Sequence, residues 1–298
     1  ILQRVTWAYV VEHFLRNRRG YGSAWVVNAA SLSMMVGLFG AGLLAQYLSW
    51  RWVFNAAAGV ALVTCAIVFA RLPRIGSSTI GQQTEVSRGR FVKAQVEDFR
   101  GLVRDSRARS AMLVSFTIWF AYFSVYTYWG SFLSWQFELE SGLVGLVTVL
   151  VALGYIVGSQ VGGRLSDRVG RGKVIRAGLV LLGILLGVLP CIRSLALAVI
   201  GTLVVAMAYH FTYSAQLALA SELMPRARST AMSINYFFTY LGMMTGSAVA
   251  GVLLSHFGYR GVGLASGCAC WAGAVLVHRL LRLSRAAGVS TAQRCRAG

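Results

Sequence analysis

Charged residues are scarce in this sequence, and acidic residues are the scarcest. Only 12% of the 298 residues are charged, and 9 Asp and Glu stand against 28 Lys and Arg. A soluble globular domain usually carries about 25% charged residues. The few carboxylates do not pair with a nucleophile, and the five cysteines do not have metal-ligand spacing. We therefore expect no enzymatic activity, no metal and no cofactor.

Long apolar runs make up most of the sequence. Hydrophobic residues make up 57% of the chain, and they form runs of the length that crosses a bilayer. This pattern predicts an all-α integral membrane protein with about eight full spans and one partial span. The partial span lies at 1–12, and the full spans lie at 21–48, 52–70, 110–135, 142–163, 174–192, 194–220, 230–257 and 261–281.

The basic residues gather in every second connection between these runs. The connections that hold 24 of the 28 Lys and Arg are 13–20, 71–109, 164–176, 226–228 and the C-terminal 279–298. The intervening connections hold only Arg51, Arg193 and Arg260. This asymmetry follows the positive-inside rule, so the basic connections and the C-terminus are expected in the cytoplasm. A nucleic-acid-binding protein would gather its charge on one folded surface, so we expect no nucleic-acid partner.

Two segments of the chain repeat each other. "SMMVGLFGAGLLAQYLSWRWV" at 33–53 aligns with "GMMTGSAVAGVLLSHFGYRGV" at 242–262, with matching Met pairs, glycines and a late Arg. Both copies have the same loop-charge polarity, which is typical of transporters built from two parallel six-helix halves. Four expected spans precede the second copy, but almost none precedes the first. We therefore expect a truncated chain that lacks roughly one hundred residues of the first half.

A compact basic segment, "GGRLSDRVGRGKVIR" at 162–176, separates two of the runs. Residues 163–175 resemble the signature loop of the major facilitator superfamily, G-x-L-x-D-R-x-G-R-[KR]-x-x-[LI]. The sequence departs from that pattern at Gly172, where a second basic residue is usual. A phosphate-binding loop does not fit, because no strand precedes the segment and no G-K-[ST] follows it.

The resemblance implies two six-helix halves, of which the first is incomplete here. Residues 1–70 would be the remnant of the N-terminal half, with the end of helix 4 and helices 5 and 6. Residues 71–109 would be a cytoplasmic linker with an amphipathic helix at 90–105. Residues 110–283 would be the complete C-terminal half, and 284–298 a disordered cytoplasmic tail.

The resemblance also implies a function, which is secondary transport of a small molecule by alternating access. The segment "GLFGAG" at 37–42 lies where drug–proton antiporters of the family carry a Gly-rich motif, although Ala41 takes the place of its central Pro. We expect proton-coupled efflux by a monomer in a bacterial cytoplasmic membrane. The alternatives are an uptake symporter and a non-transporting membrane remnant or interaction protein.

The resemblance assigns the signature residues to gating. Gly163 and Gly170 are expected to allow tight backbone at each side of a short turn. Asp167 is expected to contact the opposite half near the start of the 21–48 helix, and the alternative is that the segment only fixes topology. The gating residues are Gly163, Asp167, Arg168, Gly170 and Arg171.

Polar and aromatic residues inside the spans are candidates for the substrate pathway. His210 either takes part in proton coupling or is a neutral, hydrogen-bonded core residue. The aromatic stripe of the 110–135 span either lines a cavity or packs against lipid and a neighbouring helix. The candidates are Trp119, Tyr122, Tyr126, Tyr209, His210, Tyr213, Gln216, Asn235, Tyr236 and Asn28.

Overall fold

A computed structural model describes residues 33, 36–37, 39–71, 101, 104–222 and 228–297. All regular secondary structure in these ranges is helical, which confirms the all-α membrane fold expected from the sequence. A helix over 39–47 precedes the labelled elements. The labelled elements are α3 (Trp50–Arg71), α6 (Ser106–Phe137), α7 (Ser141–Val169), α8 (Arg171–Val188), the 3-10 turn η2 (Leu189–Cys191), α9 (Leu195–Glu222) and α10 (Arg228–Ala297).

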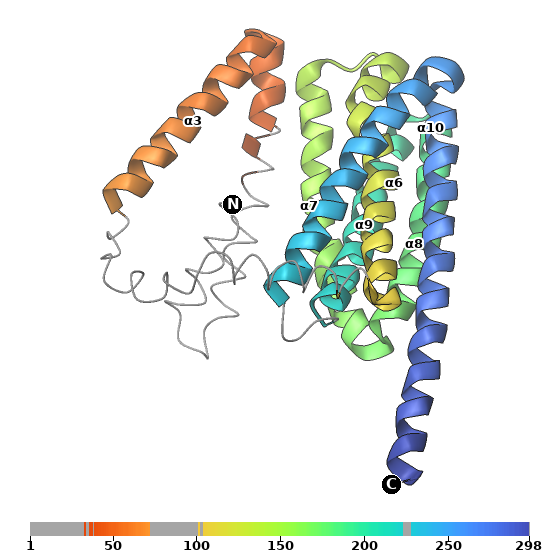
Figure 1. Ribbon diagram of the computed structural model, residues 1–298. Coiled ribbons are helices and arrows are strands. Elements are labelled where there is room, and N and C mark those ends of the chain that lie inside the picture. The colour runs from red at the N-terminus through yellow and green to blue at the C-terminus, as the bar shows by residue number, and fades with distance from the viewer. Residues whose placement is uncertain are drawn as a thin grey trace.

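The described helices account for the predicted spans from 52 onward. Six of them are long and apolar enough to cross a membrane. Two predicted spans, 230–257 and 261–281, belong to the one element α10, which turns at Gly258 because that residue has φ 65° and ψ −172°. Figure 1 shows its two arms running in opposite directions, so α6 to α10 form a six-helix bundle beside which α3 stands apart. The partial span at 1–12 lies outside the described residues.

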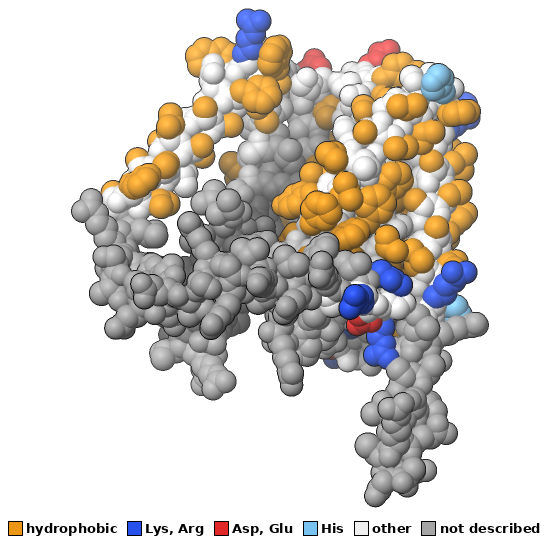
Figure 2. Space-filling model, viewed as in Figure 1, with side chains coloured by type: hydrophobic (Ala, Val, Ile, Leu, Met, Phe, Trp, Pro, Cys, Tyr) orange, Lys and Arg blue, Asp and Glu red, His pale blue; other side chains and the backbone are white. Residues whose placement is uncertain are grey.

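The two ends of the bundle differ in charge. Figure 2 shows an apolar band across the bundle and a group of Lys and Arg side chains at the end where α7 meets α8. We call this the basic end, and the end that contains Gly258 the opposite end. Apolar side chains are exposed all along α3 and on the outer faces of the bundle, as expected where helices meet hydrocarbon.

Glycines bring the helix axes of the bundle close together. Gly154, Gly158 and Gly162 lie on one face of α7, and a Cβ added at Gly158 would overlap the backbone of Met207 in α9. In a membrane, small residues at such contacts replace the hydrophobic driving force that is absent between helices, because they allow close van der Waals packing. The face of α7 that carries these three glycines therefore fixes the position of α9.

Two expectations about chain breaks are corrected here. The predicted connection at 164–176 is helical except at Gly170, because α7 continues to Val169 and α8 begins at Arg171. The tail expected to be disordered from 284 belongs to α10, which continues as far as Ala297 and contains no proline that would end it. The amphipathic helix expected at 90–105 lies almost wholly outside the described residues.

The α7–α9 contact gives a first prediction. Gly158→Val should destabilise the bundle by about 1–3 kcal/mol, because the new side chain must displace the α9 backbone. Gly163→Val is the matched control, because a Cβ at Gly163 on the same helix meets no atom within 4 Å. The thermal unfolding midpoint of the detergent-solubilised chain measures both. Equal midpoints for the two variants would contradict the packing role of Gly158.

Candidate functional site

The signature segment forms a one-residue turn at the basic end. Gly170 has φ 99°, a conformation that favours glycine, and its N–H donates to the Ser166 carbonyl at 3.1 Å. The sequence therefore identified Gly170 correctly as a tight-turn residue. Gly163 lies inside α7, so the prediction that it allows a turn is wrong. Its neighbour Gly162 is the closely packed glycine, since a Cβ there would overlap Phe211 of α9.

The charged residues of the segment have unequal surroundings. Arg171 is half-buried, and its guanidinium donates to the Ala218 carbonyl near the end of α9 at 3.0 Å. A cation at the C-terminal end of a helix is favourable because the last carbonyls there lack backbone partners. Asp167 and Arg168 are exposed. The start of the 21–48 helix, the expected partner of Asp167, lies outside the described residues.

Six of the sequence candidates meet in one group of rings, which we call the aromatic cluster. Tyr122 of α6 stacks on Tyr209 of α9 with ring centroids 3.8 Å apart, and its hydroxyl lies 2.9 Å from that of Tyr155. Offset and edge-to-face contacts of this kind add stability beyond the area they bury. The members are Trp119, Tyr122, Tyr126, Tyr155, Tyr209, His210 and Tyr213.

The aromatic cluster is part core and part surface. Tyr122 and Tyr209 are 2% and 1% exposed, so both belong to the packed interior. His210 is half-buried, and its ring stacks on that of Tyr155 with centroids 4.0 Å apart. Tyr155 was missed by the sequence reasoning, because a single Tyr among the apolar residues of α7 gives no signal of its own. Its role becomes visible only when α6, α7 and α9 are placed side by side.

Two further candidates, Gln216 and Asn235, meet in a buried polar cluster with Ser115. The Asn235 side-chain oxygen accepts from Ser115 Oγ at 2.5 Å and from the Gln216 amide at 2.9 Å, and that amide also donates to Ser115 Oγ. All three residues are 0% exposed. Ser115 was missed, although its four-residue spacing from Trp119 places both on one face of α6. Tyr236 is half-buried and belongs to neither cluster, and Asn28 lies outside the described residues.

The polar cluster leaves some hydrogen-bonding capacity unused. The Gln216 Oε1, Asn235 Nδ2 and Thr239 Oγ1 atoms are buried and have no hydrogen-bond partner among the described residues. A buried polar group without a partner costs about 1–3 kcal/mol. The cluster thus joins α6, α9 and α10 by hydrogen bonds and keeps spare donors and acceptors in the interior.

One small cavity lies inside the bundle among the described residues. The cavity between Tyr122, Trp129 and Thr202 holds about 10 Å³, which is about the space of one water molecule. The Trp129 indole N–H closes it by donating to Thr202 Oγ1 at 2.9 Å.

A separate contact joins the 39–47 helix to the bundle at the opposite end. The Gln46 amide donates to the Glu140 carboxylate at 2.5 Å. A Cβ added at Gly42 would lie 2.9 Å from the Ser141 carbonyl oxygen and 3.0 Å from the Gly145 Cα, so the two helices touch along glycines. We call this set of residues the opposite-end contact. It includes the last glycine of the "GLFGAG" segment, which the sequence linked to antiporters.

Comparison with known proteins agrees with this architecture. The model of the Major Facilitator Superfamily matches residues 5–140 and 129–296. The MFS-type transporter YceJ of Bacillus subtilis is 26% identical over 243 residues, which are 80% of this chain and 59% of that protein. The inner membrane transport protein YdhP of Escherichia coli K12 is 24% identical over 241 residues, which are 80% of this chain and 58% of that protein. The chain therefore spans less than two thirds of the length of these relatives.

The polar cluster gives a second prediction. Asn235→Leu should destabilise the bundle by about 1–3 kcal/mol, because Ser115 and Gln216 then lose their common acceptor. Adding Gln216→Met should cost less than the sum of the two single changes, because it removes a donor that has already lost its partner. The exposed Asn55→Leu on α3 is the control. Thermal unfolding in detergent measures all four variants, and strictly additive shifts would contradict the cluster.

Proposed function

Because the chain belongs to the major facilitator superfamily, whose model matches most of its residues, we propose that it carries a small molecule across the membrane by alternating access. The direction we propose is efflux, and the driving force is a proton gradient. The observation that carries the mechanism is the opposite-end contact. Gln46 and Gly42 meet α7 at one end of the bundle, whereas the signature segment lies at the other end.

The proposed cycle uses these two ends as gates. In one state of the proposed cycle, the opposite-end contact closes one side of the membrane. Opening requires the Gln46–Glu140 hydrogen bond to break while a contact at the basic end forms. A substrate shifts this equilibrium only if it binds one state more tightly than the other. Exposed Asp167 and Arg168 are the proposed gating residues at the basic end, and Gly170 and Arg171 hold their turn in place.

The aromatic cluster supplies the proposed substrate surface. Ring faces attract apolar molecules and organic cations, and the exposed parts of Trp119, Tyr126 and Tyr213 are suited to such solutes. His210 is the proposed proton-linked residue, because it is the titratable nitrogen base within the cluster. The positive-inside pattern supports a cytoplasmic placement of the basic end and the C-terminus, in a bacterial cytoplasmic membrane. The transporter is proposed to work as a monomer.

Transport assays test the proposed function. Vesicles that contain the protein should lose a preloaded hydrophobic cation, such as ethidium, faster than empty vesicles, and a protonophore should abolish the difference. Uptake driven by the same gradient would contradict the efflux direction and favour the uptake symporter. No transport across a substrate panel, by this chain and by a version extended with any in-frame upstream sequence, would favour the non-transporting alternative.

The gating proposal gives a further prediction. Asp167→Asn should lower the transport rate on the order of fivefold or more, because a gating contact is worth about 1–3 kcal/mol. Membrane abundance should not change, since Asp167 is exposed and outside the packed interior. Glu138→Gln, which neutralises an exposed carboxylate at the opposite end, is the control. Unchanged transport by Asp167→Asn at equal abundance would leave the segment with a topological role only.

A further inference from the structure

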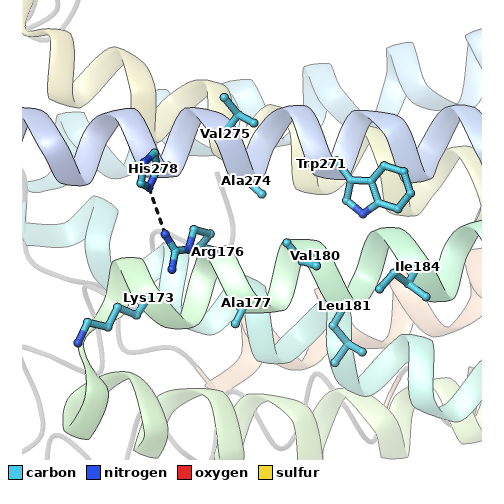
Figure 3. Close-up of a pocket in the computed structure, with 10 residues that line it drawn as sticks. All are labelled: Lys173, Arg176, Ala177, Val180, Leu181, Ile184, Trp271, Ala274, Val275 and His278. Atoms are coloured by element: carbon cyan, nitrogen blue, oxygen red, sulfur yellow. Dashed lines mark hydrogen bonds between the residues drawn. The ribbon is translucent and has the colours of Figure 1, made fainter.

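A groove runs between α8 and the second arm of α10 and reaches the basic end. Its volume is about 840 Å³, and Figure 3 shows the side chains of both helices that line it. None of the described residues that line it is acidic. The substrate surface proposed above does not include this groove, because the aromatic cluster lies on α6, α7 and α9.

The walls of the groove are apolar and open to the surroundings. Val180, Leu181 and Ile184 of α8 are 42–48% exposed, and Trp271 and Val275 of α10 are 47% and 54% exposed. In a membrane these side chains meet lipid acyl chains rather than water. The Trp271 ring lies over Gly183 of α8, where a larger residue would have to displace it.

Two cations lie at the basic end of the groove. Lys173 and Arg176 are both exposed, on the first two turns of α8. An Arg176 guanidinium nitrogen lies 3.1 Å from Nδ1 of His278 on α10. A guanidinium only donates, so Nδ1 of His278 is the acceptor in this contact. The contact therefore joins the two walls and holds the Arg176 cation at the basic end of the groove.

We propose that this groove binds one anionic phospholipid, with its phosphate at Lys173 and Arg176 and an acyl chain along the apolar walls. Charge and length both favour this occupant. The cations complement a phosphate, and an ammonium or guanidinium near an anionic lipid surface favours binding. Lys173 and Ile184 are separated by about 17 Å at 1.5 Å per residue, which is close to half of the roughly 30 Å hydrocarbon core. One leaflet of lipid therefore matches the groove from its cationic end to its apolar end.

Trp271 reports directly on the occupant, because brominated acyl chains quench a tryptophan that they touch. The purified chain is placed in vesicles that contain increasing fractions of brominated phosphatidylglycerol or brominated phosphatidylcholine. The chain has 8 Trp residues, so the signal of Trp271 is the difference between the unaltered chain and Trp271→Phe. Half-quenching of this signal should occur at a roughly thirtyfold lower fraction of the anionic lipid, which is the fold-change that corresponds to about 1 kcal/mol from each of the two cations.

Charge variants show whether the preference comes from the groove. The double change Lys173→Gln and Arg176→Gln should abolish the preference for the anionic lipid. The pair Lys173→Arg and Arg176→Lys should keep it, because both cations remain. Arg104→Gln with Arg109→Gln removes two exposed cations near the start of α6 and should also leave the preference intact.

Three results would overturn the proposal. Equal quenching by the two lipids would show an unselective hydrocarbon surface. An equal loss of preference in both Gln pairs would show a general effect of surface charge. Absence of Trp271 quenching by either lipid would show that another occupant, such as a second copy of the chain, covers the groove. Circular dichroism of each variant confirms that the helices are intact, so that a folding defect is not read as lost lipid binding.

Discussion

Close approach of helix backbones at glycine is the constraint on which the rest of this bundle depends. Lipid tails are as apolar as leucine, so helices in a bilayer gain stability from tight packing rather than from escaping water. Gly158 meets α9, Gly246 meets α6, and Gly267 of α10 meets the Gly183 backbone of α8. A cavity of about 10 Å³ lies beside Tyr122 among these closely packed helices.

The candidate sites lie at the surface and at the two ends of the bundle. The aromatic cluster offers ring faces at the surface, while its central rings, Tyr122 and Tyr209, belong to the core. The single-residue turn at Gly170 positions exposed Asp167 at one end. At the other end, Gln46 reaches Glu140 from a helix outside the bundle. Alternating access requires such a geometry, in which two bodies touch at one end or the other.

Features set by spacing along one helix could be predicted from the sequence. Apolar run length located the described spans from residue 52 onward, loop charge distinguished the two ends, and the signature spacing identified Gly170 as a turn. Three- and four-residue spacing correctly grouped His210 with Tyr213, and Trp119 with Tyr122.

Features that depend on neighbouring helices could not be predicted in the same way. Tyr155 of α7 joins the aromatic cluster through contacts with other helices, such as its contact with Tyr122 of α6. Ser115 of α6 joins the polar cluster only through Asn235 and Gln216, which lie on other helices. The close contact at Gly162 rather than Gly163 depends on the rotation of α7 against α9. The predicted turn at 164–176 was too long, because charged residues continue the helix when their side chains reach water.

The proposed transport cycle requires the opposite-end contact to open and close. A distance measurement by pulsed electron paramagnetic resonance tests this most directly. Spin labels are attached at the exposed neighbours Tyr47→Cys and Leu143→Cys, which leave Gln46 and Glu140 in place, after the five native cysteines have been replaced by alanine or serine. A short and a long distance are expected, with populations that change with pH or on addition of a transported solute. One short distance under all conditions, in protein that still transports, would contradict it.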